Sequence, residues 1–168
     1  MLGELDTCEV IFSRYDTDKN KKFHNYSRQY EELLKPYREE KIKFLEIGVF
    51  YGESLKAFRE VFKNAEYIIG LDTNQNCKTC ENKDDDIYVE IGDATSNNVI
   101  NSIIEKYGNF DIILDDVYNL YTSVRTFEYR RELANRSTPI ISRNWSISRP
   151  HVLVFVNKLR RSKFDDLG

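Results

Sequence analysis

The chain has 168 residues, which is enough for one well-buried core and too few for two independent domains. Its net charge of −3 and its pI near 5.5 give no basic field that would gather nucleic acid or an anionic membrane. No apolar run approaches the ~20 residues of a membrane span, and the first residues carry no secretion signal. We therefore expect a cytosolic protein with reduced cysteines.

Two helices are predicted in the first 40 residues. Cys8 and Phe12 keep helical spacing with Leu5 up to a polar turn at 15–20, so Cys8 is predicted to be a small buried residue. A second helix follows and ends near Pro36. Its apolar positions are Tyr26, Tyr30, Leu33, Leu34 and Tyr37.

From residue 42 onward, short apolar runs alternate with helical patterns. Strands that alternate with helices of this length indicate βαβ crossovers and a mostly parallel sheet covered on both faces. The predicted strands are 42–47, 67–71, 87–91, 110–114, 139–142 and 152–156, and the predicted helices between them are 55–62, 99–107 and 120–127.

The segment 43–55 is predicted to be a buried strand, a glycine turn and the start of a helix. A dinucleotide fingerprint would place glycine at position 46, whereas Glu46 would repel a pyrophosphate, and the spacing of Gly48 and Gly52 is G-x-x-x-G. A phosphate-free cofactor with a cationic amino-acid group, such as S-adenosylmethionine, fits better than NAD. The alternative is an ordinary turn in which both glycines supply positive φ.

Four consecutive predicted strands end in acidic residues. Ligands of open doubly wound sheets bind outside the carboxyl ends of the strands, so these acids are candidate ligand contacts. A carboxylate after the second strand can accept ribose hydroxyls, and one after the third can accept an adenine amine. Each aspartate could instead cap a turn or helix. The acids are Glu46, Asp72, Asp93, Asp115 and Asp116.

Cys77-Lys-Thr-Cys80 is half of a zinc-binding pattern. The chain has no second C-x-x-C, and its two histidines lie far away in sequence. We predict two partly exposed thiols in a loop or short helix.

The motifs Leu45–Leu55, Gly70–Asp72, Gly92–Ala94 and Phe110–Asp116 resemble those of class I S-adenosylmethionine-dependent methyltransferases. The leader Asp16-Thr-Asp-Lys19, followed by His24-Asn-Tyr26 and Tyr30, is similar to that of the macrocin-type sugar O-methyltransferases. The resemblance implies S-adenosylmethionine as methyl donor. It also implies cofactor contacts at Glu46, Gly48, Gly52, Asp72, Asp93, Ala94 and Asp115.

The resemblance further implies a Rossmann-like, doubly wound fold. We expect a single methyltransferase-like domain over residues 1–168, with a helical N-terminal extension (1–40) and a cofactor-binding half (41–116). A shortened acceptor-side half (117–168) would follow, with a truncated C-terminal sheet edge.

The acceptor side departs from the family pattern. The family has Asp-Asp-Gly-Ser-His, with a histidine general base, where this chain has Asp115-Asp-Val-Tyr-Asn119. An asparagine cannot accept a proton near neutral pH, so the candidate bases are Asp116 and His24. The family's acidic pair for a divalent metal is replaced by Ser142-Arg-Asn144. Asp115 and Asp116 remain as a weak candidate site for Mg²⁺.

The function predicted from the sequence is transfer of a methyl group to a hydroxyl of a sugar or related small molecule. The alternative is a catalytically impaired methyltransferase-like protein that binds S-adenosylmethionine, or keeps only the fold, as a binding or regulatory module. RNA cap methylation is disfavoured because no glutamate follows Glu132. The expected partner is a small-molecule acceptor such as a carbohydrate, without membrane or nucleic acid.

Overall fold

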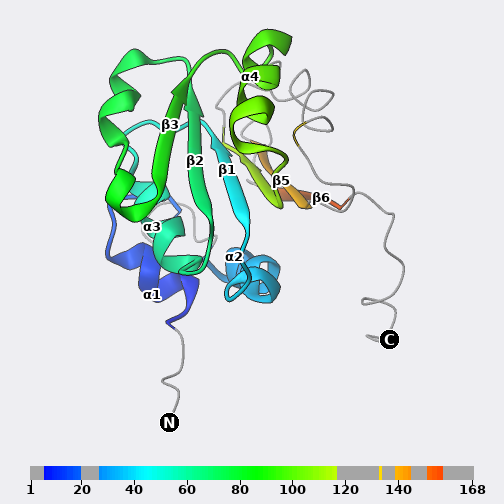
Figure 1. Cartoon of the computed structure of the whole chain (residues 1–168). Helices are drawn as coiled ribbons and strands as arrows, with labels where there is room; N and C mark the ends of the chain where they lie inside the picture. Colours follow the sequence, from blue (N-terminus) through cyan, green and yellow to red (C-terminus); the bar gives the residue numbers. More distant parts are fainter. Residues whose placement is uncertain (1–5, 20–26, 117–132, 134–138, 145–150, 157–168) are drawn as a thin grey trace.

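The computed structural model describes residues 6–19, 27–116, 133, 139–144 and 151–156. Within them, a six-stranded sheet has the strand order β3-β2-β1-β4-β5-β6 (Figure 1). Neighbouring strands from β3 to β5 are parallel, and β6 is antiparallel to β5. The predicted mostly parallel sheet is therefore confirmed. Its strands are Lys43–Ile47 (β1), Tyr67–Asp72 (β2), Ile87–Ile91 (β3), Ile112–Asp115 (β4), Pro139–Asn144 (β5) and His151–Val156 (β6).

Helices pack on both faces of the sheet. Side chains alternate along β1, so Phe44 joins the core under α1, α2 and α3, whereas Leu45 joins the core under α4. The helices are Cys8–Ser13 (α1), Ser27–Leu34 (α2), Glu53–Val61 (α3) and Asn97–Tyr107 (α4), with short 3₁₀ helices at Lys35–Tyr37 (η1), Gln75–Cys80 (η2) and Lys83–Asp85 (η3).

Local sequence sets the ends of these helices. The Thr7 hydroxyl accepts a hydrogen bond from the Val10 N–H (3.4 Å) and caps the start of α1. Gly108 ends α4 with φ +74° and donates its N–H to the Ile104 carbonyl (2.8 Å). None of the described helices is long and apolar enough to cross a membrane.

An aromatic cluster holds α1 against α2 and α3. The Phe12 ring meets the rings of Tyr30 and Phe58 edge-on, each at a centroid distance of 5.6 Å. All three side chains are fully buried. Cys8 is also fully buried, as predicted. These contacts fix the N-terminal segment on one face of the sheet, beside α3 (Figure 1).

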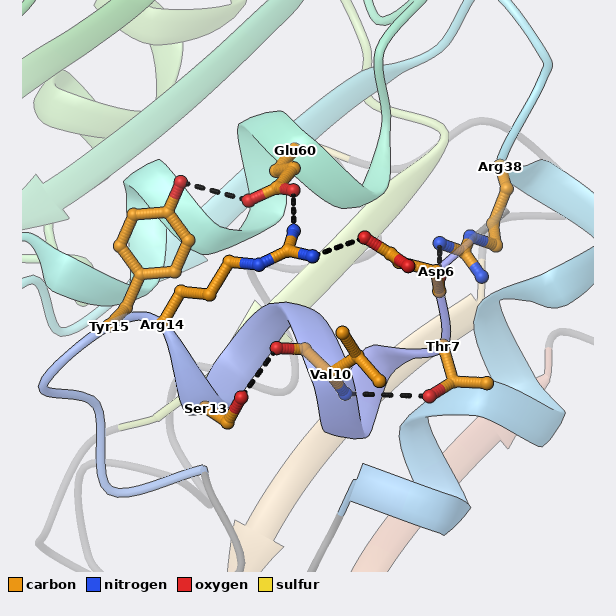
Figure 2. A network of polar contacts seen from close by, with 8 residues as sticks. All are labelled: Asp6, Thr7, Val10, Ser13, Arg14, Tyr15, Arg38 and Glu60. Carbon is orange, nitrogen blue, oxygen red and sulfur yellow. Dashed lines mark hydrogen bonds and ion pairs between the residues drawn. The ribbon is translucent and has the colours of Figure 1, made fainter. Parts of the chain in front are cut away.

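A polar network adds to this anchorage (Figure 2). The Arg14 guanidinium pairs with both Asp6 and Glu60, and thereby links the segment before α1 to α3. The Tyr15 hydroxyl donates a hydrogen bond to Glu60 (3.0 Å). The chain that leaves α1 is therefore tied to the helix that follows the glycine turn.

The carboxyl ends of four strands lie level at one edge of the sheet. The backbone ladder continues past the strands, since Gly48 N–H donates to Leu71 O (2.9 Å), Gly92 N–H to Asp72 O (2.9 Å) and Asp116 N–H to Ile47 O (2.8 Å). Strand order reverses between β1 and β4, with β2 and β3 on one side. This edge is the place where doubly wound folds bind ligands.

Two predicted strands differ from those observed by two residues at one end, and the ends of the others agree to within one residue. The fourth was predicted at 110–114 but begins at Ile112, because Phe110 donates its N–H to the carbonyl of Leu133 instead (2.8 Å). The fifth runs to Asn144, two residues further than predicted. The helix predicted at 120–127 lies outside the described residues.

Candidate functional site

The turn between β1 and α3 is tight and left-handed at three positions. Gly48 (φ +95°) and Gly52 (φ +76°) have the positive φ expected of glycine, and Phe50 (φ +53°) adopts it despite its side chain. Gly52 donates its N–H to Val49 O (2.9 Å), which closes the turn. Phe50 and Tyr51 lie at its tip and are about three-quarters exposed (74% and 75%).

Asp72, at the end of β2, holds this turn. Its Oδ2 accepts hydrogen bonds from the N–H groups of Val49 (2.8 Å) and Phe50 (3.3 Å), and its Oδ1 accepts one from Asn74 (2.9 Å). Partial burial by itself would raise the pKa of Asp72, but these backbone donors outweigh it and lower the pKa. The predicted ligand carboxylate thus also shapes the loop beside it.

The two cysteines of η2 lie against the same turn. The Cys77 thiol donates to the Phe50 carbonyl (3.2 Å), and a Cβ added at Gly52 would lie 2.6 Å from Cys80 Cβ. Cys77 is only 2% exposed, so the prediction of partial exposure is wrong for this residue, whereas Cys80 is half-buried. Burial, and then the nearby Asp72 carboxylate, raise the pKa of Cys77 to about 11.

Glu46 is a fully buried carboxylate in β1. Its Oε2 accepts a hydrogen bond from the Ser54 hydroxyl of α3 (2.7 Å). Its Oε1 lies 2.9 Å from Lys19 Nζ and accepts no hydrogen bond of good geometry from the described residues. Burial raises the pKa of Glu46, while Lys19 and Ser54 act in the opposite direction.

Lys19 was not predicted as a site residue, although it belongs to the leader motif. Its side chain is 2% exposed, and Nζ also lies 2.6 Å from Asp116 Oδ2. A buried lysine needs an acidic partner. If Lys19 of the leader is buried, an ion pair with a carboxylate is therefore expected. The sequence could not show which acids it would meet, because 27 and 97 residues separate it from Glu46 and Asp116.

Asp93 and Ala94 follow β3 at the same edge. Asp93 Oδ1 accepts hydrogen bonds from the N–H (2.8 Å) and hydroxyl (2.7 Å) of Thr95, which lower its pKa. This is the turn-forming role that was the alternative for this aspartate. Its side chain is exposed, and Ala94 is buried against the α4 core.

Asp115 is the buried last residue of β4, level with Ile47 of β1, and Asp116 follows it. No group of three or more His, Cys, Asp or Glu side chains that could hold a metal occurs among the described residues. Magnesium binding at Asp115 and Asp116 therefore stays a prediction. His24 and Asn119 lie outside the described residues.

The fold matches solved methyltransferase structures. The MycE methyltransferase of mycinamycin biosynthesis, crystallised with Mg and SAH, superposes with a TM-score of 0.75 over 84% of this chain and 37% of that chain, at 23% identity. An O-methyltransferase from Bacillus cereus in complex with SAH gives a TM-score of 0.56 over 86% of this chain and 68% of that chain, at 17% identity. These similarities show the fold alone. No protein-family model matches the chain.

Sequence comparison narrows the relationship. Demethylmacrocin O-methyltransferase from Streptomyces fradiae is 30% identical over 123 residues, and mycinamicin VI 2''-O-methyltransferase from Micromonospora griseorubida is 31% identical over the same length. The chain is related to the macrocin-type O-methyltransferases of class I. The predicted resemblance is thus confirmed. The matched residues are 69% of this chain but only 30% of each relative's length.

Proposed function

We propose that the chain forms the cofactor-binding part of an S-adenosylmethionine-dependent O-methyltransferase that acts on a hydroxyl of a sugar or related small molecule. The buried Glu46 carboxylate beside the glycine turn carries this proposal. The relatives, whose names describe O-methylation of macrolides, support the reaction class. The matched part is under a third of their length, so the acceptor belongs to the proposal alone. The cytosol is its proposed location.

The chemistry of the strand ends fits this cofactor. The turn Gly48-Val-Phe-Tyr-Gly52 carries no cationic side chain that would favour a phosphate, and Glu46 would repel one. An amino-acid ammonium group would instead be attracted to Glu46. Asp72 and Asp93 would accept hydrogen bonds from a ribose and an exocyclic amine. We infer that Gly48, Gly52, Ala94 and Asp115 provide the surrounding wall.

When bound, S-adenosylmethionine supplies a methyl group that its sulfonium already activates. The protein therefore has to orient the acceptor hydroxyl, and orientation can contribute up to roughly 7–11 kcal/mol in favourable systems. Proton removal is proposed for Asp116 or His24. Among the described residues, no three His, Cys, Asp or Glu side chains group together as metal ligands.

Calorimetric titration with S-adenosylmethionine and its demethylated product, with and without Mg²⁺, tests cofactor binding. We expect both ligands to bind and Asp72→Ala to weaken both by more than about tenfold, because this variant loses a ligand contact and the support of the turn. Asp84→Ala, an exposed acid in η3, is the matched control and should bind like the wild type. The absence of binding heat with both ligands would contradict the proposed function.

A binding or regulatory module is the second candidate. The engagement of Asp116 by Lys19 favours it, because one candidate base already has a cationic partner. Incubation with labelled S-adenosylmethionine and either a nucleotide sugar or a macrolide glycoside separates the two functions. Label transfer to either acceptor supports the enzyme, and cofactor binding without transfer to these acceptors supports the module.

A further inference from the structure

Lys19 joins the two sides of the ligand-binding edge. Glu46 belongs to β1, and Asp116 directly follows β4, so the strands on either side of the order reversal each present one carboxylate to the same ammonium group. The distances from Nζ are 2.9 Å and 2.6 Å. A single side chain from the N-terminal segment therefore bridges the position where doubly wound folds bind their ligands.

The two carboxylates need this cation. Glu46 is 0% exposed and the Asp116 side chain only 6%, so neither is well screened by water. Without Lys19 they would repel each other, and either would turn away or take up a proton. Asp18, 3.6 Å from Nζ and 40% exposed, adds a further acid from the leader. The cluster is thus acidic overall even with Lys19 in place.

Contacts between the segment before Lys19 and α3 position this side chain. Phe12 of α1 packs on Phe58. Arg14, the C-cap of α1, bridges to Glu60 (Figure 2), so two contacts tie the segment before Lys19 to α3. Lys19 Nζ also lies 5.9 Å from the centroid of the Phe58 ring. Because Gly52 is the N-cap of α3, the same helix positions the glycine turn and supports the leader.

We propose that Lys19 is the positioning residue of this site: its ammonium group holds Glu46 in place for the ammonium group of an amino-acid-bearing cofactor and holds Asp116 beside the acceptor. This inference rests on the proposed function. It assigns the leader a role in cofactor binding, with Lys19 acting through the two carboxylates.

Lys19→Met tests the inference by removal of the charge with little change in length. Calorimetry should show that S-adenosylmethionine and its demethylated product both bind about 10- to 100-fold more weakly, the loss that is typical when a group that orients metal-ligating side chains is removed. Lys106→Met is the matched control, because it removes a lysine from another Lys–Glu pair, with Glu90, and should leave both affinities unchanged.

A double variant separates charge from packing. In Lys19→Met/Asp116→Asn one of the two repelling carboxylates is neutral, so we expect part of the lost affinity to return. Lys19→Arg keeps the charge and should bind within a few-fold of the wild type. These two variants also carry the test if Lys19→Met fails to fold, which thermal unfolding will show.

The outcomes distinguish the two proposals. Wild-type protein that binds neither ligand overturns the proposed function and the role of Lys19 with it. Wild-type binding together with full affinity of Lys19→Met overturns only the role of Lys19. So does a folded double variant that binds no more tightly than a folded Lys19→Met. If Lys19→Met does not fold, a folded Lys19→Arg that does not bind within a few-fold of the wild type overturns the role of Lys19.

Discussion

Gly52 meets two separate constraints. Its φ of +76° disfavours any other residue, and an added Cβ would lie 2.6 Å from Cβ and 2.8 Å from Sγ of Cys80. Neither atom can retreat freely, since Cys80 belongs to η2, which also donates a thiol hydrogen bond to the turn through Cys77. The turn is therefore held by its contacts with η2 as well as by its own backbone conformation.

We expect Gly52→Ala to lower the free energy of unfolding by about 1–3 kcal/mol and to weaken cofactor binding. Gly108→Ala is a suitable comparison, because it has a similar φ of +74° and meets only the flexible Lys43 Nζ at 3.3 Å. It should destabilise the protein without any effect on the cofactor. Chemical denaturation and calorimetry measure the two effects, and equal binding by both variants would contradict this reading of the turn.

Helix α1 depends on its partners. With six residues it is far shorter than the ~12–15 residues that isolated helices need in water. Its stability must come from the burial of Cys8, Ile11 and Phe12 rather than from its own hydrogen bonds. The polar contacts of Figure 2 lie nearer the surface, with the Arg14 side chain 44% exposed.

Phe12→Ala should therefore cost about 3–5 kcal/mol of unfolding free energy, as is typical for truncation of a buried aromatic side chain. Arg14→Ala should cost much less, because solvent screens its ion pairs. Urea denaturation of both variants gives the comparison. A larger loss for Arg14→Ala would show that the polar network, and not the aromatic cluster, anchors the leader.

The sequence predicted the elements well and their side-chain partners poorly. Apolar periodicity located the strands, and the acids that follow them were correctly expected at one edge, because parallel strands end on the same side. The partners of Lys19 and the burial of Cys77 depend on segments that meet only after folding. The residue type alone could not assign a role to Asp93, because its carboxylate forms a turn with Thr95 at the predicted ligand edge.

The whole protein should lose stability in acid. The pKa is lowered in the fold for six described carboxyl groups and raised for one, Glu46. A lowered pKa stabilises the fold above the unfolded value, 3.8 for Asp and 4.5 for Glu, and this contribution is lost as the pH falls through the folded pKa. The six groups are Asp6, Glu31, Asp72, Glu81, Glu90 and Asp93.

We therefore expect the unfolding free energy to decline steadily below pH 4.5. Glu46 acts in a different range, because its protonation between its raised folded pKa and 4.5 relieves the cost of its burial and adds no further change below pH 4.5. Urea denaturation between pH 3 and pH 7 measures the profile. A flat profile would mean that the unfolded chain retains the same interactions.

The level strand ends set a length that a ligand must match. Neighbouring strands lie about 4.8 Å apart, so Glu46 of β1 and Asp93, which follows β3, are separated by roughly 10 Å across the sheet, with Asp72 between them. They are also staggered along the strands, because Glu46 is level with Gly70 and Asp72 with Ile91, so the row spans more than roughly 10 Å. A molecule that reaches all three must carry its amine, diol and base along a chain of that length. Methionine or adenosine alone would contact only some of these three acids. Each would therefore lack the gain in binding affinity that comes from linking the two halves in one molecule.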